Sequence, residues 1–189
     1  MFRISEPSEQ DAVQFVSNQH NLPFTYAEVG ATNAMPPADY KVDHNRIRLG
    51  EGEATFRRAV EALKSWRHFD LGWVGILPHG VVVEVGAMVA VKARAFGTWS
   101  LNATRVVYVI DEPGRFGFAY GTLPEHVERG EERFLVEWLD DDSVWYDILA
   151  FSRPQHPLVR LGSPLARMLQ KRFARESLAR MKLATDFHG

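Results

Sequence analysis

The stretch Gly117–Phe134, GFAYGTLPEHVERGEERF, decides the fold because it contains two strand patterns and the loop between them. In the first pattern bulky residues alternate with small ones, which is typical of a strand with one crowded face and one nearly bare face. The alternating residues are Phe116, Phe118 and Tyr120 on one side and Gly117, Ala119 and Gly121 on the other. Because glycine in a strand often marks close approach, we expect a helix backbone, a second sheet or a flat ligand against the bare face.

The second half of the stretch brings charged residues next to a second strand. Pro124 ends the first strand, and the loop Glu125 to Gly130 carries His126 and Glu128. In the strand that follows, Glu132 is in phase with an apolar face formed by Phe134, Val136 and Trp138. We therefore expect the Glu132 carboxylate to point inward, at the mouth of the core.

These polar residues suggest three kinds of chemistry. His126 and Glu132 are candidates for a catalytic acid and base pair, and with Glu128 and Glu131 they could ligate a metal. The offsets of two and three residues match no known metal motif, so no metal is expected. In the structural alternative, His126 and Glu128 order the loop by bonds to its backbone, and Glu131 pairs with Arg129 or Arg133.

The remaining strands and their short connections predict an antiparallel meander. Connections of hairpin length can only join antiparallel neighbours, and three such connections occur, at 96–98, 112–114 and 140–142. The expected strands are 40–49, 71–77, 81–95, 99–111, 115–122, 131–139 and 143–152.

Three helices complete the pattern. A short helix follows the cap residue Ser8, and a second, at about 51–66, carries a regular apolar stripe. A long helix begins at Ser163-Pro164 and runs to about Leu183. Its expected inward stripe is Leu165, Met168, Leu169 and Phe173. The order of elements predicts an α+β helix-grip fold, in which a curved antiparallel sheet wraps around the long C-terminal helix.

The same stretch resembles the signature of a family of uncharacterised bacterial and plant proteins. The resemblance extends to Ala150–Pro154 and, earlier in the chain, to Thr25-Tyr26, Val29–Thr32, Leu49–Gly52 and Trp66. It implies a fold similar to START-like and pollen-allergen-like helix-grip proteins. The family has no established activity, so the resemblance implies no role for any residue.

Composition places limits on the class of protein. The 189 residues, 46% of them hydrophobic, suffice for one domain, in which residues 1–24 form a helical extension and 25–189 the helix-grip body. The chain has no cysteine, a polar N-terminus and no apolar run near the roughly 20 residues of a membrane span. We expect a cytoplasmic protein without a cofactor. The sequence specifies no oligomeric state.

The C-terminal segment is basic although the net charge of the chain is −2. Between Arg153 and Lys182 the sequence has eight Lys or Arg residues and Glu176 as the acidic one. Such a segment binds phosphates or an anionic membrane, or is a solvated helix face. Its outward row is expected to be Arg167, Lys171 and Arg175, whereas Arg172 pairs with Glu176, or reaches Glu132 or a ligand.

These observations favour a pocket between the sheet and the long helix that binds a small apolar or lipid-like ligand. The candidate ligand-binding residues are Gly117, Ala119, Tyr120, Gly121, His126, Glu128, Glu132 and Arg172. One alternative is an enzyme with Glu132 as general base and His126 assisting. The other is a module that binds a protein partner or nucleic acid through the basic helix, although nucleic acid is disfavoured because exposed stacking aromatics are missing from the pattern.

Overall fold

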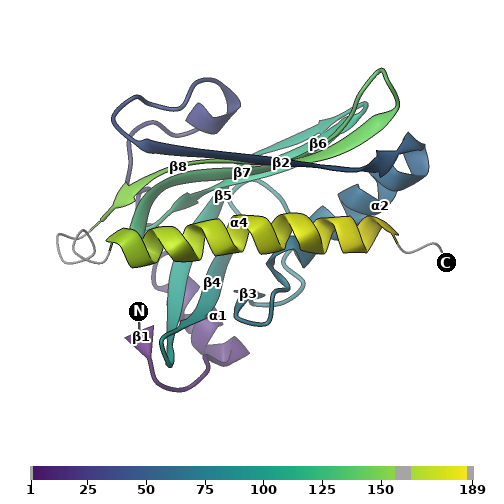
Figure 1. The fold of residues 1–189 in the computed structure, drawn as a ribbon. Helices are drawn as coiled ribbons and strands as arrows, with labels where there is room; N and C mark the ends of the chain where they lie inside the picture. The colour runs from purple at the N-terminus through teal and green to yellow at the C-terminus, as the bar shows by residue number, and fades with distance from the viewer. Residues whose placement is uncertain (1, 156–162, 187–189) are drawn as a thin grey trace.

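A curled antiparallel sheet wraps around one long helix in the computed structural model, which describes residues 2–155 and 163–186 (Figure 1). Within these described ranges eight strands pair in the order β2-β8-β7-β6-β5-β4-β3, with β1 against β5, and every pair is antiparallel. The strands are β1 (Phe2–Arg3), β2 (Lys41–Glu51), β3 (Val74–Leu77), β4 (Met88–Ala95), β5 (Thr98–Glu112), β6 (Arg115–Thr122), β7 (Glu128–Trp138) and β8 (Ser143–Pro154). The helix-grip fold expected from the sequence is confirmed.

Tight turns produce the meander, as the sequence predicts. Phe96 and Gly97 both have positive φ at the β4–β5 turn, as the hairpin turns that suit strand twist require. One expected strand is too long, however, because residues 81–87 form a loop before β4. Val81 and Val83 still pack against the core, and the Val81 carbonyl accepts a hydrogen bond from Trp66 Nε1 at 2.8 Å. The alternating pattern of residues 81–87 therefore reflects a loop that buries every second side chain against the core, and not a strand.

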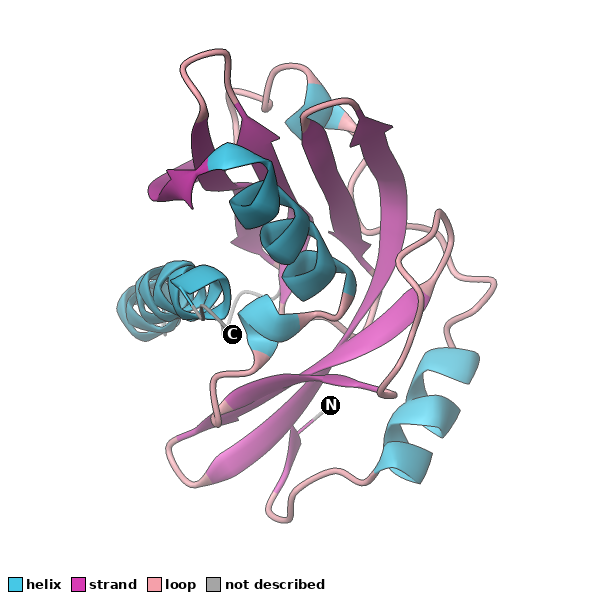
Figure 2. Ribbon diagram, turned by 90° about the vertical axis from the view of Figure 1, so that its right-hand side faces the viewer, coloured by secondary structure: helices cyan, strands magenta, loops and turns pink. Residues whose placement is uncertain are grey.

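The helices occupy both sides of the sheet. They are α1 (Glu9–Ser17), α2 (Gly52–Lys64) and α4 (Ser163–Asp186), with 3-10 turns η1 (Ala31–Asn33) and η2 (Arg67–Phe69). Figure 2 shows α4 and α2 inside the curl of the sheet and α1 outside it. The Ser8 hydroxyl accepts a hydrogen bond from the Asp11 amide and so caps α1, as its sequence predicts. Among the described residues no helix has the length and apolarity needed to cross a membrane.

The inner core is solid only beneath the second half of α4. There Met181 packs with a group of fully buried aromatic residues that includes Phe118, Phe134 and Tyr146. The Tyr146 hydroxyl lies 3.1 Å from the Ser177 hydroxyl of the helix. Burial of these side chains is the main source of stability in this half of the molecule.

Two residues of the expected inward stripe of α4 are not buried. Leu165 and Met168 are exposed, whereas the most buried residues of the helix are Ala174, Ser177, Met181 and Thr185. The physical reason is that the first half of α4 does not rest on a packed core. It spans an open space, so its apolar side chains border a cavity.

Candidate functional site

A cavity of about 1010 Å³ lies between the inner face of the sheet and the first half of α4. Most of its walls are apolar, and Phe69 with Phe173, whose rings are 5.0 Å apart, separates it from the solid core. The apolar lining includes Ile47, Trp73, Val74, Val91, Ile148, Leu169 and Leu178. A concave apolar site of this size, with a few polar groups, is the usual form of a small-molecule site.

One polar group of the cavity wall is the hydrogen-bonded pair formed by Tyr120 and Glu132. These residues are direct cross-strand partners on β6 and β7, and the Tyr120 hydroxyl donates a hydrogen bond of 2.6 Å to Glu132 Oε2. Both line the cavity, which confirms the inward phase predicted for Glu132. Among the described residues Glu132 forms no other hydrogen bond, so its second oxygen is available to a ligand.

Burial raises the pKa of Glu132 to about 7, because protein atoms around the carboxyl disfavour its charged form. The hydrogen bond from Tyr120 acts in the opposite direction, and the charge of Asp43 adds to the rise. Burial also raises the pKa of Tyr120 well above its usual value. Near neutral pH the Glu132 carboxyl is therefore protonated, and so uncharged, in a large fraction of the protein molecules, and the Tyr120 hydroxyl keeps its proton.

His126 and Glu128 also line the cavity, and the hydrogen bonds of the His126 ring are local, whereas the Glu128 carboxyl is hydrogen-bonded to Ser152 of β8. The Glu128 amide donates a hydrogen bond of 3.0 Å to His126 Nδ1, so the imidazole orders the loop that leads into β7. Burial lowers the pKa of His126 to about 4 and raises that of Glu128. Among the described residues His126 makes no hydrogen bond to Glu132, whose partner is Tyr120 instead.

The three small residues of β6 lie on the other face of the sheet, away from the cavity. A Cβ added to Gly121 would lie 2.1 Å from the Tyr26 hydroxyl oxygen, and one added to Gly117 would lie 2.4 Å from the Phe134 carbonyl. Ala119 is fully buried. The expected close approach is therefore present at Gly121, where the Tyr26 side chain crosses the bare face. Gly117, Ala119 and Gly121 do not line the cavity.

Sequence reasoning missed the role of Glu131. This carboxylate accepts hydrogen bonds from the Gly30 amide at 2.7 Å, the Thr32 amide at 3.0 Å and the Tyr26 hydroxyl at 2.8 Å, and a further one from the Thr32 hydroxyl. The expected pairing with Arg129 or Arg133 is wrong, and Arg133 binds Asp147 instead. The residues at both ends of this contact belong to the stretches that carry the family resemblance, which was the available signal.

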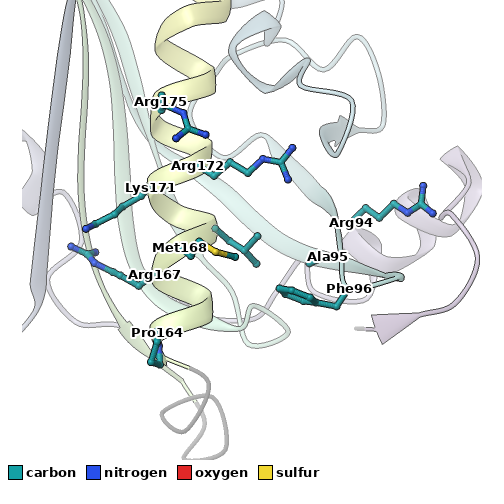
Figure 3. Close-up of a pocket in the computed structure, with 10 residues that line it drawn as sticks. Arg94, Ala95, Phe96, Pro164, Arg167, Met168, Lys171, Arg172 and Arg175 are labelled. Carbon is teal, nitrogen blue, oxygen red and sulfur yellow. The ribbon is translucent and has the colours of Figure 1, made fainter.

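Arg172 lies outside the cavity, in a groove at its entrance. Its guanidinium donates a hydrogen bond of 2.8 Å to Glu176 and stacks 4.4 Å from the Trp73 ring, so the expected pairing within the helix is confirmed. The groove, of about 720 Å³, lies between the β4–β5 hairpin and α4 (Figure 3). It shares Phe96, Leu169 and Lys171 with the cavity lining, so the groove and the cavity are continuous.

The groove is rich in cationic side chains. Five of them line it, namely Arg94, Arg167, Lys171, Arg172 and Arg175. Arg167 was expected to point outward, but it binds Asp43 of β2 through both terminal nitrogens, one of them at 2.6 Å from Asp43 Oδ1. Among the described residues no group of three His, Cys, Asp or Glu side chains is arranged to hold a metal ion.

The sheet, the long helix and the cavity between them define a START-like, helix-grip protein. The chain belongs to the family described as Domain of unknown function (DUF1990), whose model matches residues 25–180. It is 39% identical to a UPF0548 protein of Deinococcus radiodurans, over 93% of this chain and 94% of the relative. It is 36% identical to a UPF0548 protein of Dictyostelium discoideum, over 96% and 94% of the two chains.

Solved structures agree with this fold. A hypothetical protein from Helicobacter pylori is 13% identical, with a TM-score of 0.57 over 86% of this chain and 96% of its own. The Zhui aromatase/cyclase from a Streptomyces species is 8% identical, with a TM-score of 0.56 over 78% and 94%. At these identities the likeness establishes the fold alone.

Proposed function

We propose that this protein is a cytoplasmic binding protein that holds a small apolar or lipid-like molecule in the cavity beneath α4. The observation that carries the proposal is the cavity itself, at about 1010 Å³. Small-molecule sites commonly have volumes of roughly 300 to 1,000 Å³ and combine apolar walls with a few polar groups that fix orientation. This cavity is therefore large enough to enclose most of a lipid-sized molecule.

The Tyr120–Glu132 pair is the polar anchor in this proposal. Tyr120 occupies one carboxyl oxygen of Glu132, and the other remains available on the cavity wall. A neutral carboxyl both donates and accepts hydrogen bonds, which suits an uncharged carbonyl or hydroxyl group of a largely apolar ligand. An ionised carboxylate would be costly next to such a ligand, because it would lose its contact with water.

The direct test fills the cavity from its wall and measures binding of a neutral apolar fluorophore, Nile red. Ala150 lines the cavity and is the cross-strand partner of Glu132, so Ala150→Phe places a ring inside it. Its neighbour Leu149 pairs with Arg133, on the opposite face of β8, and Leu149→Phe is the matched control. We expect Ala150→Phe to weaken binding at least about tenfold, a loss of roughly 1.4 kcal/mol, and Leu149→Phe to leave it unchanged.

A second cavity-filling variant keeps the test valid if Ala150→Phe fails to fold. Ala93→Phe fills the cavity from β4, on another part of the sheet, and should have the same effect. If both filled variants fold and bind Nile red as well as the wild type does, the dye occupies another site and the proposal is wrong.

An enzyme is the second candidate, and the raised pKa of Glu132 favours it. A carboxyl whose pKa is about 7 is suited to general acid and base catalysis near neutral pH. The group that contacts Glu132 is the Tyr120 hydroxyl, so Tyr120 takes the assisting position in place of His126. The two candidates differ in the fate of the bound molecule. Mass spectrometry that recovers it unchanged after incubation supports binding, whereas conversion that Glu132→Gln abolishes supports catalysis.

A further inference from the structure

Four large apolar side chains are exposed around the entrance of the cavity. Phe2 is 70% exposed, Phe96 67%, Met168 51% and Leu165 42%. Phe2, Phe96 and Leu165 line the cavity, and Phe96 and Met168 line the groove that leads into it. These residues come from β1, the β4–β5 turn and the first half of α4, so three separate elements contribute to one apolar rim. Exposed apolar side chains that gather in this way mark interaction surfaces.

The rim lies beside an excess of positive charge. Three of the five cations that line the groove, Arg167, Arg172 and Arg175, form ion pairs, and they share two carboxylates, Asp43 and Glu176. Among the described residues Lys171 makes no ion pair, and Arg94 stacks on the Trp99 ring without one. Of the residues that the structure describes, those that line the groove include no carboxylate. Figure 3 shows Met168 and Phe96 facing each other across the groove, with Arg172 and Arg175 on the same side of the helix.

We propose that this rim, formed by Phe2, Phe96, Leu165 and Met168 together with Lys171, Arg172 and Arg175, docks on an anionic lipid bilayer. Charge complementarity identifies the partner, because anionic headgroups attract the cations while apolar side chains enter the acyl boundary. Nucleic acid would satisfy the cations but would leave Leu165 and Met168 without apolar contacts. Docking turns the cavity entrance toward the bilayer, so an apolar ligand would pass between the two without crossing water. That consequence rests on the proposed function, whereas the docking itself does not.

Flotation of the full chain with liposomes tests the proposal. The vesicles are phosphatidylcholine alone, or phosphatidylcholine with phosphatidylserine, and they contain no other apolar molecule. We expect binding to the anionic vesicles only, and we expect it to decrease as salt is added. Each basic residue near an anionic surface contributes roughly a fivefold factor in affinity. The double variant Lys171→Glu/Arg175→Glu should therefore bind at least about 25-fold more weakly. Phe96→Ser should bind about tenfold more weakly.

Matched controls change the same chemistry elsewhere. Arg57→Glu/Arg115→Glu reverses two charges away from the rim, the exposed one of Arg57 on α2 and the half-buried one of Arg115 at the start of β6. Val85→Ser removes an equally exposed apolar side chain from the loop before β4. Both controls should bind as the wild type does. Five of the six substituted residues are exposed and Arg115 is half-buried, so the melting temperature of each variant is measured to confirm that it is folded in the assay.

The outcomes distinguish this proposal from the ligand-binding one. Ala150→Phe should still bind anionic vesicles, because Ala150 lies on β8 inside the cavity and is not one of the rim residues. Docking is refuted if the wild type ignores anionic vesicles but still binds Nile red, and the ligand-binding proposal then stands. Docking through the rim is also refuted if the control variants lose as much vesicle binding as the rim variants do. Salt-sensitive binding to nucleic acid without binding to vesicles would identify the wrong class of partner and refute it too.

Discussion

Glu131 and Glu132 are adjacent in the sequence, but Glu131 accepts several hydrogen bonds whereas Glu132 has one partner on the cavity wall among the described residues. Substitution by glutamine should therefore destabilise the protein at Glu131 and stabilise it at Glu132. Glu132 is a carboxyl on the cavity wall whose pKa burial raises from 4.5 to about 7. A rise of this size means that ionising Glu132 in the folded protein costs roughly 3 kcal/mol more than in the unfolded chain. Glutamine keeps an acceptor for the Tyr120 hydroxyl but carries no charge. Glu132→Gln should therefore remove a penalty without breaking a hydrogen bond.

The sign follows from the direction of the pKa shift. Because the folded pKa is the higher one, the fold favours the protonated carboxyl, and the wild type loses stability as pH rises from 4.5 to 7. Above pH 7 the loss is complete. We expect Glu132→Gln to be more stable than the wild type by about 1 to 3 kcal/mol there, and to have equal stability at and below pH 4.5.

The control is Glu131→Gln. In the wild type the Glu131 carboxylate accepts hydrogen bonds from the backbone amides of Gly30 and Thr32, and the variant replaces this acceptor with a neutral amide. Its free energy of unfolding should therefore be lower by about 1 to 3 kcal/mol at neutral pH. Urea unfolding across the pH range measures both variants. The reasoning fails if Glu132→Gln is destabilised above pH 7, or if its gain does not change with pH.

Four further substitutions test the packing of the interior. Met181→Ala should cost about 2 to 5 kcal/mol, because Met181 is fully buried in the solid core. Leu169→Ala, on the same helix but above the cavity, should cost less than about 1 kcal/mol, and equal losses in denaturant unfolding would contradict the division of the interior. Gly121→Ala should cost more than about 2 kcal/mol of stability, because its new Cβ would lie 2.1 Å from the Tyr26 hydroxyl oxygen. The cost should be smaller in a Tyr26→Phe background, which lacks that oxygen. If the losses of the two single variants simply add in the double variant, the contact does not explain the cost. His68 is fully buried, neither ring nitrogen has a partner among the described residues, and burial lowers its pKa to about 3. The wild type should thus lose stability as pH falls from 6.5 to 3, and His68→Leu should lose less of it over the same acid titration.

Most of the fold could be predicted from the sequence because its determinants are local. Alternation places the faces of β6 and β7, and hairpin-length connections require antiparallel neighbours. The same alternation placed Glu132 on the inner wall with Phe134 and Val136. Alternation failed at Val81–Val83, because a loop that lies over a core buries every second residue as a strand does.

The parts that could not be predicted depend on contacts between distant residues. The apolar stripe of α4 is continuous, so nothing in it shows that Leu165 borders a cavity and Met168 the adjoining groove, while Met181 enters a packed core. Glu131 resembles any strand carboxylate until the segment around Gly30 lies across the sheet. The partner of Glu132 is a similar case. The sequence indicates Tyr120 as a candidate ligand-binding residue, but its hydrogen bond to Glu132 depends on the exact register of β6 and β7.

Methyl NMR with Nile red tests the central claim most directly, because it locates the bound molecule within the fold. The methyl groups of Val91, Ile148 and Leu169 line the cavity, whereas those of Leu101 and Leu123 lie in the separate core beneath α1. We predict that saturating dye shifts the first three resonances and leaves the last two in place. Shifts confined to Leu101 and Leu123, or to exposed methyl groups far from the cavity, would contradict the account.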